Sequence, residues 1–214
     1  MKLTLCYAPY TCSLVVLVSL YESGAEFEAK RVNLRKTEQL NPEFLQINPK
    51  HKVPVLLIDG EPLTENVAMA LWMTRAFPKA GILPADSDSE VKAISIMTWC
   101  ASGIHPHLTR INSPAKFCDT PGSEESIKRL AAKELDHVFG VADEMLAGRD
   151  YFFGKWCAAD THFFWTWRRA TQFSLDFSKY RNCVAHFERM QQRAAVKKAL
   201  DFEKQVLAEF AKAA

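Results

Sequence analysis

The stretch VPVLLIDGEPLTEN, residues 53–66, decides the architecture of the chain. Val53 to Ile58 is a run of β-branched residues and leucines, Asp59-Gly60 is a strong hairpin turn, and Glu61 to Leu63 returns as a partner strand. We expect a helix to follow over about residues 65–77. Because Pro54 stands directly before a buried strand, its peptide bond is a candidate for the cis form in a rigid turn.

Upstream of this hairpin, strand and helix patterns alternate. Apolar residues at alternate positions predict a strand over residues 2–7, and a buried helix over residues 13–23 ends at Gly24. A strand over residues 27–33 and a short helix opened by Asn41-Pro42 precede the hairpin. The order β-α-β-α-β-β-α predicts a mixed four-stranded sheet with helices packed on it.

Beyond Pro78 the pattern is helical throughout. Ser87 and Glu90 are spaced as a capping box that opens a long helix, which should end or bend near Pro106. Further helices are expected from about residue 125 and over residues 158–171, 180–193 and 196–213. We therefore expect two domains, a small α/β domain over residues 1–79 and an all-helical domain over residues 86–214.

Composition narrows the function. The 214 residues carry a net charge of +2 without a basic cluster, so nucleic acid is not an expected partner. No apolar run approaches the ~20 residues that span a bilayer, so no membrane partner is expected either. The six cysteines show no Cys-x-x-Cys spacing and no metal-ligand grouping. We expect a cytoplasmic protein without a metal.

Cys12 is the first chemically suggestive residue. It follows the first strand at the start of the first helix, where the positive end of the helix and its N–H groups favour a thiolate. A depressed thiol pKa is therefore expected. The alternative is that Cys12 is a small packing residue, as most free cysteines are.

The second feature combines the Val53-Pro54 turn with Glu65 and Asn66. The turn would leave the backbone of Val53 free to pair with an extended ligand. Glu65 and Asn66 begin a helix, so their backbone N–H groups and side chains could hold a carboxylate and an ammonium of one ligand. Plain helix capping explains the same residues without a ligand.

Taken together, these features resemble a known family. The segments APYTCSL (residues 8–14), NPKHKVPVL (residues 48–56) and LTENVA (residues 63–68) are similar to the glutathione site of the bacterial beta class of glutathione S-transferases. The segment FGKWCAAD (residues 153–160) is similar to the folding motif of the superfamily's helical domain. The likeness covers nearly the whole chain and is weakest in residues 110–150.

The resemblance implies a thioredoxin-like domain followed by an all-helical domain, assembled as a homodimer. It implies glutathione as a co-substrate and no further cofactor. In this interpretation Cys12 and His105 lie at the sulfur of glutathione. The backbone of Val53, the residue that follows Lys52, pairs with the cysteinyl backbone of glutathione. The γ-glutamyl end is held by Glu65 and Asn66, and the glycyl carboxylate is met by basic residues, namely Arg35, Lys36 and Lys52.

Other residues compete for the catalytic role. Other classes of the superfamily use a tyrosine or a serine near the first strand and helix, which makes Tyr7 and Ser13 alternatives to Cys12. The chain also departs from the beta-class pattern: Asn66 replaces a small residue, His51-Lys52 replaces Gly-Gln, and Pro106 replaces a lysine. Cys157 replaces the Ser or Thr of the capping motif, which should cost about 1 kcal/mol of local stability.

The resemblance leads to a transferase hypothesis. The thiolate of bound glutathione would attack a small hydrophobic electrophile held by the helical domain, a reaction typical of detoxification. One alternative is glutathione-dependent thiol–disulfide exchange through Cys12. Another is a non-catalytic adaptor that keeps the transferase fold and binds a protein.

Overall fold

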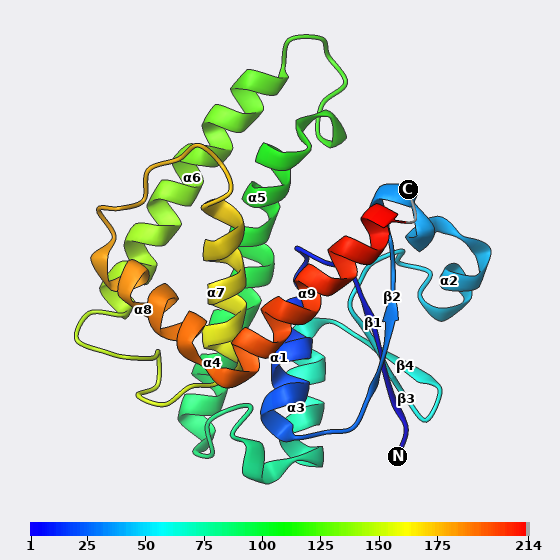
Figure 1. The fold of residues 1–214 in the computed structure, drawn as a ribbon. Coiled ribbons are helices and arrows are strands. Elements are labelled where there is room, and N and C mark those ends of the chain that lie inside the picture. The colour runs from blue at the N-terminus through cyan, green and yellow to red at the C-terminus, as the bar shows by residue number, and fades with distance from the viewer. Residues whose placement is uncertain (213–214) are drawn as a thin grey trace. The chain divides into compact units, whose positions relative to one another are not determined.

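The computed structural model describes residues 1–212, and by its internal contacts the chain divides into two compact units. The first is Met1–Ala85 together with the chain from Gln191 onward, and the second is Asp86–Met190. The last helix, α9 (Ala194–Lys212), groups with the first unit because it packs on α1 (Ser13–Ser23) (Figure 1). The expected helical domain over residues 86–214 therefore contains one helix that packs with the first unit.

The first unit is built on a mixed sheet of four strands in the order β2-β1-β3-β4 (Figure 1). β1 runs parallel to β2 and antiparallel to β3, and β3 runs antiparallel to β4. The mixed sheet predicted from the strand and helix order is thus confirmed. Its strands and helices are β1 (Leu3–Tyr7), β2 (Glu28–Arg31), α2 (Pro42–Ile47), β3 (Val55–Ile58), β4 (Glu61–Thr64) and α3 (Asn66–Ala76).

Side-chain alternation explains why β1 lies at the centre of this unit. Cys6 and Phe44 of α2 belong to one buried apolar cluster on one face of the sheet. Tyr7, the next residue along β1, points to the opposite face, where its ring lies 5.5 Å from the ring of Phe202 in α9. Helices therefore cover both faces of β1, with α2 on one face and α9 on the other.

The turns follow the local sequence. Asp59 and Gly60 both have positive φ, 49° and 96°, as a two-residue hairpin requires. Gly24 ends α1 in the left-handed conformation with φ 65°. The Val53–Pro54 peptide bond is cis. All three local predictions are confirmed.

The second unit consists of helices joined by irregular segments. Its helices are α4 (Ser87–Trp99), α5 (His105–Asn112), α6 (Glu124–Met145), α7 (Ala158–Ala170) and the first part of α8 (Arg181–Gln192). A π-helical turn at Cys100–Ile104 joins α4 to α5, so the predicted break near Pro106 is confirmed. Of the predicted helix over residues 196–213, residue 213 lies outside the described residues.

The predicted capping box at Ser87 is wrong by one residue. Asp86 is the N-cap of α4, and its carboxylate accepts a hydrogen bond of 2.8 Å from the backbone N–H of Ser89. An aspartate that already has an extended backbone offers a stronger acceptor than the following serine hydroxyl. Glu90 lies in the first turn, where its charge still favours the helix.

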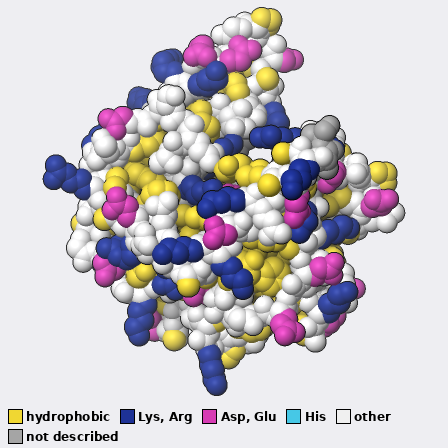
Figure 2. All heavy atoms as spheres, viewed as in Figure 1, with side chains coloured by type: hydrophobic (Ala, Val, Ile, Leu, Met, Phe, Trp, Pro, Cys, Tyr) yellow, Lys and Arg dark blue, Asp and Glu magenta, His cyan; other side chains and the backbone are white. Residues whose placement is uncertain are grey.

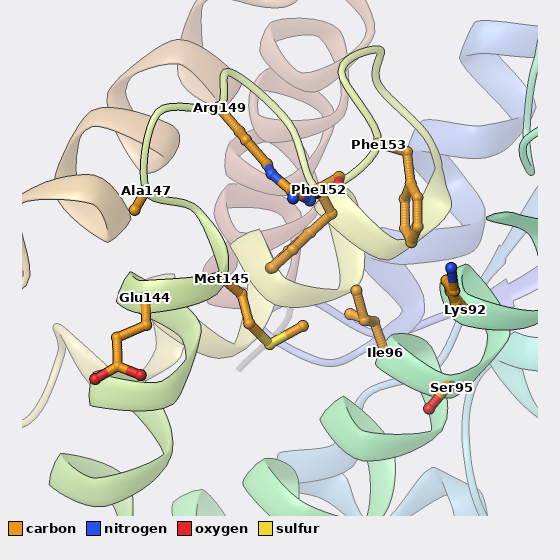
Figure 3. A pocket seen from close by; sticks show the side chains of 9 residues that line it. All are labelled: Lys92, Ser95, Ile96, Glu144, Met145, Ala147, Arg149, Phe152 and Phe153. Atoms are coloured by element: carbon orange, nitrogen blue, oxygen red, sulfur yellow. Dashed lines mark hydrogen bonds between the residues drawn. The ribbon is translucent and has the colours of Figure 1, made fainter.

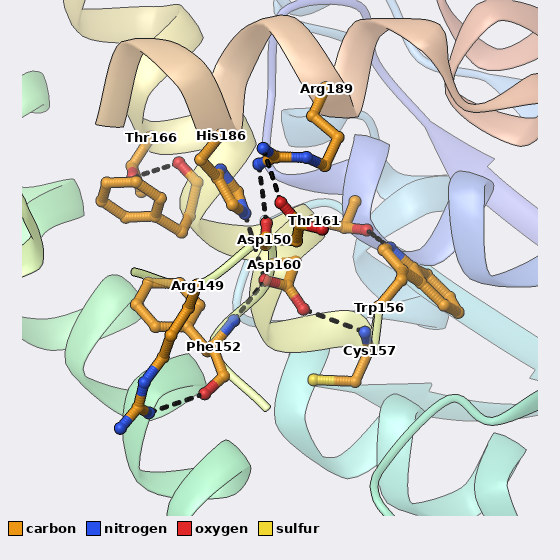
Figure 4. A network of polar contacts seen from close by, with 11 residues as sticks. Arg149, Asp150, Phe152, Trp156, Cys157, Asp160, Thr161, Thr166, His186 and Arg189 are labelled. Carbon is orange, nitrogen blue, oxygen red and sulfur yellow. Dashed lines mark hydrogen bonds and ion pairs between the residues drawn. The ribbon is translucent and has the colours of Figure 1, made fainter. Parts of the chain in front are cut away.

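Helix α7 begins at a buried network of polar contacts (Figure 4). The Asp160 carboxylate, which is fully buried, accepts hydrogen bonds from the backbone N–H of Phe152 at 3.0 Å and of Cys157 at 2.9 Å. The Nε2 atom of His186 lies 3.1 Å from the same carboxylate. Cys157 and Asp160 thus form a reciprocal capping box in which a thiol replaces the usual hydroxyl.

Lysine and arginine side chains are interspersed with acidic ones over the face drawn in Figure 2. Within residues 1–212, no helix combines the length and the apolar character that crossing a bilayer requires.

Candidate functional site

The site is centred on the loop that joins β1 to α1. Cys12 is the N-cap residue of α1. Just before it, the Thr11 hydroxyl donates to the carbonyl of Ala8 at 2.7 Å and contacts the Ser13 hydroxyl at 2.8 Å. The loop is therefore fixed by its own side chains, and Cys12 is held in one position at the amino end of the helix.

Three segments that are distant in the sequence meet at Cys12. Its thiol lies 3.8 Å from the carbonyl oxygen of Val53, to which it can donate. The side-chain amide of Asn66, the first residue of α3, donates to the carbonyl of Cys12 at 3.3 Å. The structure thus brings together the two features that the sequence identified separately.

The expected depression of the thiol pKa is wrong. Burial raises the pKa of Cys12 to about 11, although the side-chain amide of Asn66 favours the thiolate. The negative charge of Glu65 raises the pKa of Cys12 further, and the positive charge of Lys52 lowers it weakly. Loss of hydration outweighs the helix amino end here. At neutral pH this thiol is therefore protonated and acts as a hydrogen-bond donor.

Glu65 has a strained backbone directly before α3. Its φ of 72° and ψ of 122° lie outside the regions that residues with a side chain normally adopt. Such strain costs of order 1–3 kcal/mol and is concentrated at ligand sites. The exposed carboxylate pairs with the Nζ atom of Lys50 at 2.8 Å. Lys50, which sequence reasoning missed, therefore holds the Glu65 side chain at this edge.

The remaining binding candidates lie on two sides of the loop. Pro54 follows Val53 in the cis turn, and the carbonyl of Lys52 accepts from the Asn48 side chain at 2.8 Å. Of these residues, Val53 accepts from the Cys12 thiol, and Lys52 lies close enough for its charge to act on that thiol. Arg35 lies instead in a short 3-10 turn, Leu34–Lys36, that follows β2.

The other catalytic candidates make contacts of their own. Tyr7 is fully buried and its hydroxyl donates to Glu203 of α9 at 3.2 Å. Ser13 is also fully buried, against Thr11. His105 belongs to the second unit, where its ring meets that of Trp165 edge-on at 4.6 Å.

Comparison with known proteins identifies the family. Residues 1–72 match the family model "Glutathione S-transferase, N-terminal domain". The chain is 31% identical to the glutathione S-transferase GstA of Escherichia coli O157:H7, over 92% of this chain and 96% of that protein. The chain belongs to the glutathione S-transferase family. 

Solved structures place this transferase near the bacterial beta class. The beta-class glutathione S-transferase of Sphingomonas chungbukensis is 31% identical, with a TM-score of 0.82 over 94% of this chain and 98% of that one. A sphingomonad glutathione S-transferase in complex with glutathione is 30% identical, with the same TM-score and the same coverage of both chains. The predicted resemblance to the beta class is confirmed.

Glu203 is a second residue of the transferase that sequence reasoning missed. Only 1% of it is exposed, and its carboxylate accepts from the Tyr7 hydroxyl and, at 2.7 Å, from the backbone N–H of Tyr10. One signal was available, because Val196, Ala199, Glu203 and Val206 share the buried face of α9 at helical spacing. A carboxylate on that face indicates a specific partner.

A pocket of about 250 Å³ lies on the other side of the same loop, within the first unit of the transferase. Pro9 and Tyr10 line one side, Arg35 and Lys36 another, and apolar residues of α9 such as Phe210 line the third. Its walls therefore combine positive charge with apolar surface. Among the described residues, no group of three or more potential metal ligands is found.

Proposed function

We propose that this transferase conjugates glutathione to small hydrophobic electrophiles. The γ-glutamyl end is assigned to Glu65 and Asn66, and the cysteinyl backbone to Val53 in the turn with Pro54. The glycyl carboxylate is assigned to Lys52, an exposed cation in the segment before the cis turn, and exposed Arg35 is the alternative. Exposed Glu65, strained at the amino end of α3, supports the γ-glutamyl assignment.

The observation that carries the proposal is the position of the Cys12 thiol, which lies at the amino end of α1 and 3.8 Å from the carbonyl oxygen of Val53 in the cis turn. Disulfide exchange requires a thiolate, whereas burial raises the pKa of the Cys12 thiol to about 11 and so favours its protonated form at pH 7. A protonated thiol can instead donate a hydrogen bond to the sulfur of bound glutathione. That bond stabilises the glutathione thiolate and favours loss of its proton to solvent. The thiolate then forms a C–S bond with the electrophile, which releases a leaving group or takes up a proton.

The 250 Å³ pocket is assigned to the electrophile. Its α9 wall, with Leu207 and Phe210, suits an apolar body, and its position on the β1–α1 loop supports this role. We place the reaction in detoxification, in a cytoplasmic homodimer. The presence of all six cysteines as free thiols supports a reducing compartment. His105 of the second unit remains a proposed participant.

Cys12→Ala tests the mechanism. We expect conjugation of an activated chloroarene to fall about three- to tenfold, because one hydrogen bond to the thiolate is lost. Disulfide reduction with a glutathione mixed disulfide should be slow in the wild type and unchanged in the variant. Rapid disulfide reduction that Cys12→Ala abolishes would reverse the choice between the two reactions.

Glu65→Gln tests glutathione binding. By calorimetry we expect about tenfold weaker binding, because a charge-assisted hydrogen bond to the ligand ammonium becomes a neutral one. Glu61→Gln, at an exposed position of β4, is the matched control and should bind as the wild type does. Equal affinities in all three proteins would remove Glu65 from the site.

A further inference from the structure

A buried polar atom that lacks a hydrogen-bond partner marks a place where a bound ligand can complete the structure. Within residues 1–212, the side-chain oxygen of Asn66, Oδ1, is such an atom at the proposed glutathione site. In the same part of the chain, no residue that lines the pocket of about 370 Å³ in the second unit carries one (Figure 3). The unpaired acceptor of Asn66 therefore points to a ligand group that the site still has to receive.

The donor side of the Asn66 amide faces Cys12. Its Nδ2 atom donates to the carbonyl oxygen of Cys12 at 3.3 Å. Although burial raises the pKa of the Cys12 thiol, the same amide lowers it, so the amide acts on the sulfur as well. The Cys12 carbonyl fixes this orientation, because the reverse one would set two acceptors against each other. The side chain of Asn66 thus offers a ligand an acceptor.

An acceptor suits only one of the two charged groups at the γ-glutamyl end. It repels the α-carboxylate, which has no hydrogen to donate, and it attracts the α-ammonium, which has three. Glu65 is the acceptor already proposed at this end, but its Oε1 atom pairs with the Nζ atom of Lys50 at 2.8 Å. The same Nζ atom donates to the Thr64 hydroxyl at 3.0 Å. A single carboxylate with one oxygen engaged leaves N–H groups of the ammonium for a neighbouring acceptor.

We propose that Asn66 makes the transferase selective for a free α-ammonium on the γ-glutamyl end. Its Oδ1 atom accepts one N–H of the ammonium beside Glu65, while Nδ2 keeps its hydrogen bond to the Cys12 carbonyl. This inference rests on the proposed function, which places the γ-glutamyl end at Glu65. Binding gives the buried oxygen a partner, whereas a peptide without the ammonium leaves it unpaired and binds more weakly.

Calorimetry on the full chain with two ligands tests this selection. The ligands are the S-hexyl derivatives of glutathione and of glutaryl-cysteinylglycine, which lacks only the amino group. The wild type should prefer the first about a hundredfold, because hydrogen bonds to a charged group are lost with the second. Asn66→Ala should raise the Kd of the glutathione derivative about tenfold and that of the other ligand less than about twofold.

Two further variants separate the acceptor from the rest of the side chain. Asn66→Asp retains an acceptor, so it should keep the preference for the ammonium although it loses the donor to Cys12. Asn41→Ala is the matched control, because Asn41 is an exposed asparagine directly before α2 whose side chain makes no capping hydrogen bond. Both ligands should bind Asn41→Ala as they bind the wild type.

The inference is overturned if Asn66→Ala leaves both Kd values unchanged or raises them equally, since an equal rise would show a purely structural role through Cys12. Loss of the preference in Asn66→Asp would overturn it as well. Glu65→Gln, measured with the same ligands, separates this failure from that of the proposed function. If Glu65→Gln reduces the preference and Asn66→Ala does not, the γ-glutamyl assignment stands and the role of Asn66 falls. If neither variant reduces it, both fall.

Discussion

The Cys12 thiol, although it stands at the amino end of a helix, should not be the most reactive thiol of the chain. The hydroxyl groups of Ser123 and Thr120 hold the pKa of Cys118 below its usual range, whereas burial raises that of Cys12 to about 11. With iodoacetamide at pH 7, we expect mass spectrometry to find Cys118 alkylated first. The labelling rate of Cys12 should then rise steadily up to about pH 11.

Cys118→Ser is the control for this order. In this variant the remaining cysteines should be labelled slowly at pH 7, because burial also raises the pKa of Cys100 and Cys183. If Cys12 is alkylated before Cys118 in the wild type at neutral pH, or is alkylated rapidly in Cys118→Ser, the protonated thiol in the proposed mechanism is refuted.

His162 should make the stability of the fold sensitive to mild acid. It is fully buried, and neither of its ring nitrogens has a hydrogen-bond partner within residues 1–212. Burial lowers its pKa from 6.5 to about 3. The unfolded chain therefore binds the proton more tightly, and stability falls as the pH drops below 6.5. From pH 7 to pH 5 the loss should be about 2 kcal/mol.

Urea unfolding of His162→Leu provides the comparison. Other groups titrate over the same range, so the informative quantity is the difference between the wild type and the variant. Between pH 7 and pH 5, the free energy of unfolding of the variant should increase by about 2 kcal/mol relative to that of the wild type. Parallel pH curves would show that His162 does not titrate on unfolding.

At the scale of elements, the start of α7 is suboptimal. A thiol accepts hydrogen bonds poorly, so Cys157→Ser should strengthen the capping box with Asp160 and add about 1 kcal/mol to the free energy of unfolding. For a chain of this length the melting temperature should rise by about 2–4 °C. Cys183→Ser, at a buried position inside α8, is the control and should lower it. A lower melting temperature for Cys157→Ser would contradict this account of the cap.

Helix α9 should matter to the site through Glu203. In Glu203→Gln the buried acceptor for Tyr7 and Tyr10 is weakened, so we expect a loss of about 1–3 kcal/mol in stability and a higher KM for glutathione. Glu209→Gln removes an exposed ion pair with Arg31 on the same helix and should change stability by less than about 0.5 kcal/mol. An unchanged KM in Glu203→Gln would show that the β1–α1 loop does not depend on this contact.

The sequence predicts elements whose signals are local. The Asp59-Gly60 hairpin and the cis bond at Pro54 follow from neighbouring residues, and both were correct. The thiol pKa of Cys12 was mispredicted, because it depends on burial by segments about forty and fifty residues away. The role of Glu203 was missed for the same reason, since its partners lie more than 190 residues earlier.

At the scale of the whole molecule, we predict a homodimer. Two-fold assembly is the commonest arrangement of soluble oligomers. Light scattering at micromolar concentration should give about twice the chain mass of 24.3 kDa. A mass of one chain at that concentration would argue against the dimer.

The grouping of α9 with residues 1–85 has a consequence for biosynthesis. A ribosome releases the first four strands and their helices long before it reaches Gln191, so the second unit is fully synthesised while the first still lacks its last helix. Until α9 is synthesised, the Glu203 carboxylate cannot accept hydrogen bonds from the Tyr7 hydroxyl and the Tyr10 backbone N–H. The part of the enzyme that is translated first is therefore the part that matures last, and a nascent chain halted before Gln191 should not retain glutathione.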